Sequence, residues 1–225
     1  MKKLFFAAVF ACFSSAAFAQ TSQGTIVASG SLGYQNITHK SDADTDKAGN
    51  KSFTIAPSIG YMLRDGLEAG ISTDYTSSSG ESNFYSIMPD GSRELLSSRE
   101  TSDRCFAIGP YLRKYFSVSE KIVFTGQAYI NYISTEHDSH SDYDNGSSRS
   151  SNTSTGFGIG VKPGITFFPT PEIGLSAGFG NLGYTRSTST SELAYFEDYK
   201  STSSDFGLNL SGSTLSFGLG YFISR

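Results

Sequence analysis

The chain has 225 residues, enough for one ordinary domain or one mid-sized barrel. It contains 24 Gly, 13 Tyr and 18 Phe but no Trp, and many Ser and Thr residues stand between the aromatic ones. This composition disfavours helix and favours pleated strands, on which aromatic and β-branched side chains pack well. The formal net charge of −4 argues against nucleic acid as a partner, since phosphate binding needs clustered Lys and Arg.

Residues 1–19 have the pattern of a signal peptide. Lys2 and Lys3 precede the apolar run "LFFAAVFACF", and "AFA" at 17–19 supplies the small residues that precede cleavage, which we expect before Gln20. A lipoprotein box at "VFAC" is an alternative, although Phe10 is bulky for it. Cleavage removes two Lys and leaves 15 basic residues against 21 acidic ones, a formal net charge of −6. Residues 20–225 are expected to form one domain.

Eight segments of the mature chain alternate apolar residues with small or polar ones, the period of a strand with two different faces. They are 25–35, 53–63, 67–75, 106–116, 122–132, 157–167, 173–179 and 206–225. The phase slips near "SGS" at 211–213, where we expect a β-bulge. No run of 18 or more apolar residues follows the signal peptide, so the sequence predicts no transmembrane helix.

Short and long connections alternate strictly between these segments. The short ones are "RDG", "SVSEK" and "PTPE", and the long ones, rich in Ser, Thr, Asp and Asn, are 39–51, 78–103, 135–154 and 186–204. An even number of strands with short turns at one end and long polar loops at the other is typical of bacterial outer-membrane barrels, of which eight strands is the smallest common size. We therefore predict an all-β, eight-stranded antiparallel up-and-down transmembrane β-barrel with short periplasmic turns and four long extracellular loops.

Three prolines recur at intervals of 53 residues, at Pro57, Pro110 and Pro163. Each lies on the apolar face of a predicted strand, where proline removes one donor from the ladder. In hydrocarbon a lost backbone partner is costly, so we expect at each proline a local bulge or a carbonyl satisfied elsewhere.

The segments "IAPSIGYML", "AIGPYLRKYF", "VKPGITFF" and "LSFGLGYF" resemble the eight-stranded outer-membrane β-barrel family. That group takes in the transmembrane domain of outer-membrane protein A and outer-membrane protein X, and the resemblance is greatest to the Bacteroidetes-type porin-family barrels. It covers nearly the whole mature chain and implies a monomer in the bacterial outer membrane, in contact with lipid and lipopolysaccharide. It also implies recognition by the outer-membrane insertion machinery through Tyr221 and Phe222, although the chain continues beyond them with "ISR".

The alternation turns Glu68, Asp74, Arg113 and Lys162 inward. Glu68 and Arg113 should meet near the periplasmic end. Two interpretations stay open: a gate in a narrow channel for ions or small solutes, or a plug, since an eight-stranded barrel is just wide enough for its own side chains. The inward residues Tyr111, Tyr115, Gln127, Tyr129 and Asn131 add bulk and donors that favour a plug. Cys105, the one cysteine left after cleavage, is expected inward and inert.

The connection "STEHDSHSDYDNG" places His137 and His140 among Asp138 and Asp142, which are candidate ligands of a divalent cation. A second acidic group, His39, Asp42, Asp44 and Asp46, lies in the first long connection. A rim-located enzyme is a further hypothesis for such residues. Their spacing matches no catalytic or calcium-loop motif, and acidic polar loops are typical of solvated segments, so we predict no metal site, no cofactor and no catalysis.

Aromatic residues at strand ends are expected to form interfacial girdles: Tyr34, Tyr61, Tyr75, Phe116, Tyr132, Phe167 and Tyr221. The stretch "FYSIMPDGSRELL" predicts a hairpin that projects above the membrane, and such a hairpin could bind an extracellular ligand. A soluble lipocalin-like barrel with its apolar face inward is the alternative, disfavoured because the charges gather on the face rich in Gly, Ser and Thr. The expected role is structural or in cell-surface interaction.

Overall fold

A computed structural model describes residues 21–40, 47–88, 92–143, 146–191, 199–209 and 216–224. Ten strands run through this part of the chain: β1 (Ile26–Lys40), β2 (Lys47–Arg64), β3 (Leu67–Ile87), β4 (Arg93–Ser117), β5 (Ile122–Tyr143), β6 (Gly146–Phe167), β7 (Ile173–Gly178), β8 (Asn181–Ser191), β9 (Tyr199–Asn209) and β10 (Ser216–Ile223). The described residues contain no helix with the length and apolar character needed to cross a membrane. The predicted signal peptide, Gln20 and the predicted bulge at 211–213 lie outside the described residues.

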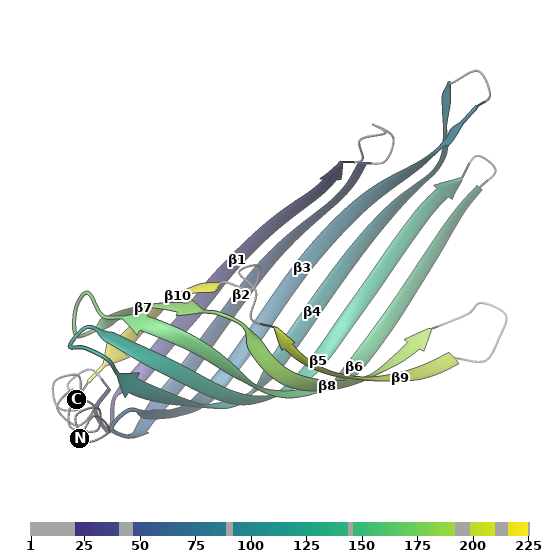
Figure 1. The fold of residues 1–225 in the computed structure, drawn as a ribbon. Coiled ribbons are helices and arrows are strands. Elements are labelled where there is room, and N and C mark those ends of the chain that lie inside the picture. Colours follow the sequence, from purple (N-terminus) through teal and green to yellow (C-terminus); the bar gives the residue numbers. More distant parts are fainter. Residues whose placement is uncertain are drawn as a thin grey trace, which may run out of the picture.

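Eight strands form a closed antiparallel ring in the order β1–β2–β3–β4–β5–β6–β7–β10, with β10 returning to β1. Farther along the axis β8 takes the place of β7 beside β6, and β9 pairs with β8 (Figure 1). The predicted seventh strand, 173–179, corresponds to β7, and β8 continues it beyond the expected end. The predicted eighth strand, 206–225, begins within β9 and includes β10, so most of the predicted loop at 186–204 is strand. The predicted all-β class and eight-stranded antiparallel architecture are confirmed.

The seventh strand breaks opposite Pro163. Gly164 pairs with Gly178 on β7, whereas Val161 pairs with Leu182 on β8, so the seventh strand has gained one residue between these pairs. The extra residue is accommodated near Gly180, whose φ of 90° suits glycine because it lacks a Cβ. The Phe179 N–H donates to the Pro163 carbonyl at 3.2 Å. The bulge expected at this proline therefore lies in the partner strand.

The other two prolines interrupt the ladder without changing its register. The pairing of β2 with β3 omits Ala56 and Pro57 and resumes with the same offset at Ser58. The pairing of β4 with β5 likewise omits Gly109 and Pro110. Each proline keeps its pairing with the preceding strand of the ring. Of the two expected outcomes, a local bulge or a carbonyl satisfied elsewhere, the bulge is absent at these two sites, where the ladder instead omits two residues.

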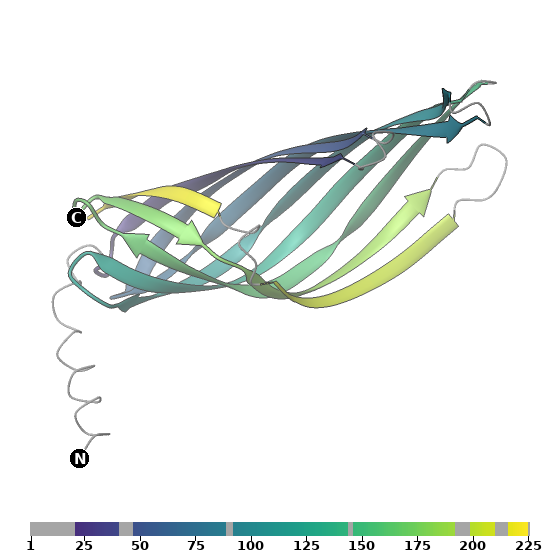
Figure 2. The same ribbon diagram turned by 45° about the horizontal axis from the view of Figure 1, so that its top comes forward.

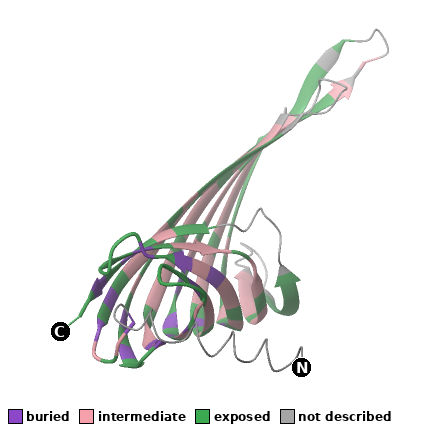
Figure 3. Cartoon of the chain, turned by 60° about the vertical axis from the view of Figure 1, so that its left-hand side comes forward, coloured by how far each residue is buried: buried purple, intermediate pink, exposed green. Residues whose placement is uncertain are grey.

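The strands separate an apolar outer face from a mixed inner face. The large side chains on the outer face form a belt around the ring, and many of them are exposed by about half: Leu32, Ile59, Ile71, Leu112, Phe124, Ile130, Ile159, Leu175 and Leu219 are examples. Buried residues gather inside the ring at the end that carries the short turns (Figure 3). Six of them form one apolar cluster: Val27, Met62, Tyr115, Val123, Phe168 and Phe222.

The long polar connections are built largely of strand. β3 and β4 have 21 and 25 residues, and their hairpin reaches farthest from the ring (Figures 1 and 2). β5 and β6 have 22 residues each and are joined by 144–145. The predicted loops at 78–103 and 135–154 are thus mostly paired strands. Their Ser- and Thr-rich sequences lack the apolar alternation by which the other strands were recognised.

Val161 lies on the outer face of β6 near the middle of the apolar belt and is 46% exposed. We expect Val161→Arg to lower the free energy of unfolding in phospholipid vesicles by about 2–4 kcal/mol, because the guanidinium would lie in hydrocarbon. Guanidinium-induced unfolding followed by circular dichroism measures the change. Thr153→Arg, on the same face of β6 above the belt, is the matched control and should be near neutral. Equal losses for both variants would contradict the assignment of this face.

Candidate functional site

A buried carboxylate lies at the centre of the polar interior. Glu68 of β3 is 0% exposed and accepts hydrogen bonds from the hydroxyls of Tyr111 and Tyr115 on β4. Nη1 of Arg113 is 3.3 Å from Oε2 of the same carboxylate. Three donors thus surround Glu68, which meets the requirement that a buried charge be paired and hydrogen-bonded.

The arrangement of these side chains follows from strand register. Tyr111, Arg113 and Tyr115 are two residues apart on β4 and so share its inner face. Arg113 pairs with Glu68 on β3 and with Gln127 on β5. Its Nε and Nη2 donate to Oε1 of Gln127 at 3.0 and 2.7 Å. We call Glu68, Tyr111, Arg113, Tyr115 and Gln127 the Glu68 network.

The apolar cluster lies against this network at the short-turn end. Tyr115 belongs to both, since its hydroxyl reaches Glu68 while its ring contacts Phe222 edge-on at 6.3 Å between centroids. The rings of Phe168 and Phe222 pack at 5.0 Å in the same edge-on manner. Polar and apolar side chains from opposite walls therefore fill this end of the ring.

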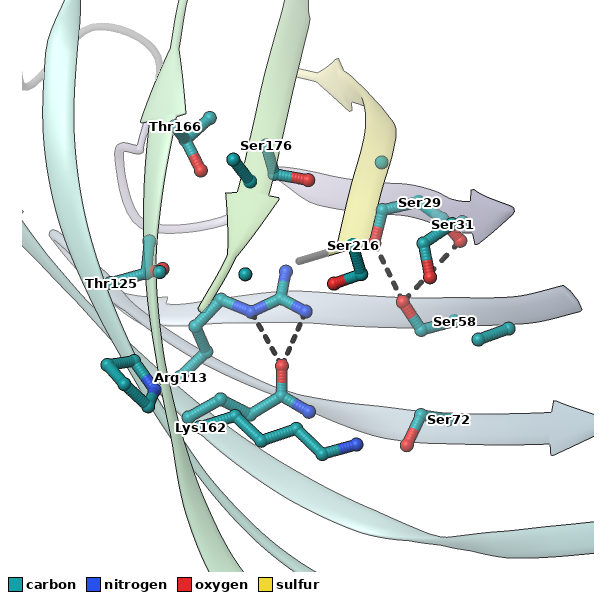
Figure 4. A pocket seen from close by; sticks show the side chains of 18 of the residues that line it. Ser29, Ser31, Ser58, Ser72, Arg113, Thr125, Lys162, Thr166, Ser176 and Ser216 are labelled. Carbon is teal, nitrogen blue, oxygen red and sulfur yellow. Dashed lines mark hydrogen bonds between the residues drawn. The ribbon is translucent and has the colours of Figure 1, made fainter. Parts of the chain in front are cut away.

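A small polar cavity lies beyond the network, away from the short turns. Its volume is about 160 Å³, and its walls carry Arg113, Gln127, Lys162, Asp74 and many Ser and Thr hydroxyls (Figure 4). Nζ of Lys162 lies 4.8 Å from the centre of the Tyr129 ring, and the Tyr129 hydroxyl donates to Asn181 at 3.0 Å. Neither Asp74 nor Lys162 forms an ion pair with another described residue.

The four predicted interior residues are thus divided by the structure. Glu68 and Arg113 meet, as the sequence predicted, whereas Asp74 and Lys162 line the cavity separately. The apolar cluster around Phe168 and Phe222 was not predicted from the sequence. Strand alternation could have predicted the position of Phe168, because the residue that follows the outward Phe167 must point inward.

The predicted C-terminal aromatic pair is divided between the two faces of β10. Tyr221 points outward and is 51% exposed, while Phe222 points inward and is 3% exposed. The role of the pair in membrane insertion stays a prediction. Phe222 has in addition a packing role inside the ring.

The histidine-rich segment is also divided by strand alternation. His137 shares the inner face with Asp103, which its Nδ1 contacts. His140 lies on the outer face, where its Nε2 is 3.2 Å from Asp142. In the described part of the chain no group of three or more His, Cys, Asp or Glu side chains is placed to hold a metal ion. The candidates His137, Asp138, His140 and Asp142 therefore do not converge on one site, and Asp42, Asp44 and Asp46 lie outside the described residues.

The predicted girdle aromatics all lie on the outer face and are exposed: Tyr34, Tyr61, Tyr75, Phe116, Tyr132, Phe167 and Tyr221. Cys105 is a free thiol on the inner face of β4, half-buried beside Thr135.

The sequence matches the family model of the outer membrane protein beta-barrel domain over residues 5–223. The chain belongs to this family. It is a protein of the bacterial outer membrane, and its short turns are periplasmic while its long hairpins are extracellular. The apolar belt is accordingly the lipid-facing surface, which excludes the lipocalin-like alternative with the apolar face inward.

Solved structures of outer-membrane proteins resemble this one. OprG from Pseudomonas aeruginosa is 12% identical with a TM-score of 0.45, over 92% of this chain and 99% of that one. Neisserial surface protein A is 18% identical with a TM-score of 0.36, over 88% and 97%. Ail, the attachment invasion locus protein of Yersinia pestis, is 14% identical with a TM-score of 0.31, over 89% and 99%. No curated protein matches the sequence.

Arg113 is the cation of the buried pair, so its removal leaves Glu68 without a counter-charge. We expect Arg113→Ala to lower the free energy of unfolding by about 3–5 kcal/mol, the usual cost of an uncompensated buried charge. Glu68→Gln combined with Arg113→Ala should recover part of the loss, because no buried carboxylate then remains. Denaturant unfolding of the wild type, Glu68→Gln, Arg113→Ala and the double variant in one micelle system measures the cycle. Strictly additive losses would contradict direct coupling between the two residues.

Proposed function

We propose that the chain is a non-catalytic, monomeric outer-membrane barrel, closed to solutes at its periplasmic end, that serves a structural or cell-surface interaction role through its extracellular hairpins. The observation that carries this proposal is the complete burial of Glu68 within its network. A charge in the lumen of an open pore would be hydrated, whereas Glu68 is surrounded by protein donors.

The apolar cluster adds support for a closed barrel. Its six members are at most 5% exposed. Five come from strands on opposite sides of the ring and Phe168 follows β6 directly, so they meet across the lumen. An eight-stranded ring is wide enough only for its own side chains. A continuous column of water would have to displace both the apolar cluster and the Glu68 network.

The extracellular hairpins support the surface role. We call the parts of β3–β6 beyond the apolar belt, residues 76–87, 93–105, 134–143 and 146–155, the extracellular extension. It is a paired sheet that reaches well beyond the ring (Figure 2). Catalysis receives no support from the described residues, since His137 and His140 lie on opposite faces of β5.

A narrow channel for ions or small solutes is the second candidate function. It is favoured by the polar cavity of about 160 Å³ and by the two cations in its wall, Arg113 and Lys162. Such a channel would conduct only if the Glu68 network rearranged, because the network lies between the cavity and the periplasm.

Export and insertion belong to the same proposal. Residues 1–19 would be removed as a signal peptide before Gln20, and the insertion machinery would recognise the end of β10 at Tyr221 and Phe222. Lipid and lipopolysaccharide would surround the belt, as expected for this family.

Planar-bilayer recording of the refolded chain tests the closed-barrel proposal. The wild type should show no steady ion conductance. Tyr111→Ala combined with Tyr115→Ala should conduct, since it removes two donors and two rings from the Glu68 network. Tyr34→Ala combined with Tyr132→Ala, on the outer girdle, is the control and should stay silent. Conductance of the wild type that changes in Arg113→Ala would instead establish the channel.

A further inference from the structure

The tip of the β3–β4 hairpin carries exposed apolar side chains far from the membrane belt. They are Phe84, Tyr85, Leu95 and Leu96, which are 37–51% exposed. Between them and Tyr75 or Phe106 at the edge of the belt, β3 and β4 expose no large apolar side chain among the described residues. Grouped exposed apolar side chains on a soluble surface mark interaction sites. We call these four residues the hairpin tip.

The hairpin tip has no neighbouring strands in the described structure. β2 last pairs with β3 at Ser82, and β5 last pairs with β4 at Ser97. Beyond these pairs no third described strand pairs with the two strands of the ribbon. A two-stranded ribbon without a packed face is marginally stable, so a partner that covers it would stabilise it.

Strand register shows which face carries which side chain. Tyr85 pairs with Leu95, and the register shifts beside them, with Leu96 as the additional residue. Glu81 is four residues before Tyr85 on β3 and therefore lies on the same, outer face. Glu81 pairs with Glu100, which pairs with His140 on β5. The outer face thus carries the apolar pair Tyr85–Leu95 above the acidic pair Glu81–Glu100.

The outer face below the hairpin tip is hollowed and acidic. A depression of about 280 Å³ lies across β3–β6, and its charged lining residues are Glu81, Glu100, Asp138, His140 and Arg149. Glu81, Glu100 and Asp138 form no ion pair with another described residue, whereas Glu136 is paired with Arg104. The extension holds seven Asp and Glu residues, four Arg and no Lys among its described residues. The extension therefore presents an excess of negative charge.

We propose that the outer face of the extracellular extension binds a cationic polypeptide segment that also carries apolar side chains. Its apolar residues would cover Tyr85 and Leu95, and its Lys or Arg side chains would pair with Glu81, Glu100 and Asp138. Charge complementarity selects this partner over an anionic surface, which the excess carboxylates repel. The inference rests on the surface-interaction role proposed above and names the chemistry of the partner.

Synthetic peptides provide the test, with the full chain in detergent micelles and fluorescence anisotropy as the readout. The probe alternates Lys and Val; one comparison peptide alternates Glu and Val and the other Lys and Ser. The Lys–Val peptide should bind at least about tenfold more tightly than either comparison peptide, because it alone satisfies both parts of the face. Its affinity should fall as salt is raised, since the charges on both sides are exposed.

Two double variants separate the parts of the site. Glu81→Gln with Glu100→Gln should weaken binding of the Lys–Val peptide on the order of fivefold, as expected for two exposed charge pairs. Tyr85→Ser with Leu95→Ser should weaken it by about tenfold or more, since apolar anchors dominate such contacts. Tyr143→Ser is the matched control: Tyr143 is 55% exposed on the opposite face of the same sheet, so its loss should leave binding unchanged.

Three outcomes would overturn the proposal: absence of binding, equal binding of the Lys–Val and Glu–Val peptides, or binding that neither double variant weakens. Heat-modifiable gel mobility of each variant confirms that the barrel has formed. Conductance recorded on the same preparation keeps the two proposals apart. A barrel that neither conducts nor binds the peptide refutes only this inference. A barrel that conducts refutes only the closed-barrel function.

Discussion

Closure of the backbone hydrogen-bond ladder is the constraint on which the rest of this structure depends. An unpaired N–H or C=O in hydrocarbon costs several kcal/mol, so strands cross a membrane only as a closed ring. Pro57 and Pro110 each remove one donor, and the ladder tolerates them because the gap leaves the register intact on either side. At Pro163 the register changes, and the change coincides with the break between β7 and β8. The repeated proline thus lies on equivalent strands, but the ladder accommodates it in two ways: by a gap in pairing at Pro57 and Pro110, and by a register change at Pro163.

The interior follows from the circumference of the ring. Once the outer face must be apolar, polar residues are confined to the inner one, and eight strands leave little room there for water. Glu68 can remain in such a place only because Tyr111, Tyr115 and Arg113 surround it. Where the inward residues are small, as with Ser29, Ser58 and Ser176, the same ring leaves a cavity. Side-chain size along the inner face therefore determines where the lumen is closed.

The sequence predicted the membrane part of the fold because alternation there has strong contrast. Apolar residues alternate with small or polar ones along the eight segments. The same alternation predicted that Glu68 and Arg113 would meet inside the ring. The hydrogen bonds to Glu68 were not predicted from the sequence. Tyr111 and Tyr115 were expected to point inward and fill space, but the acceptor of their hydroxyl groups was not identified. Phe168 was missed because it lies between Phe167, the last outward residue of its predicted strand, and the expected turn "PTPE". The histidine segment was taken as a loop, so the alternation that separates His137 from His140 was not applied to it.

The strands of the extracellular extension are hard to predict from sequence because they are polar on both faces. The few large apolar residues within them are therefore informative. Residues such as Ser77–Ser79 on β3 and Ser150–Ser151 on β6 offer no contrast between faces, yet they continue ladders whose register is established within the membrane. A sheet held in this way needs no apolar core of its own. Folding therefore places no demand for large apolar side chains above the belt, and exposed apolar surface there carries a cost in water. Phe84, Tyr85, Leu95 and Leu96 are consequently better explained by contact with something outside the barrel than by the barrel itself.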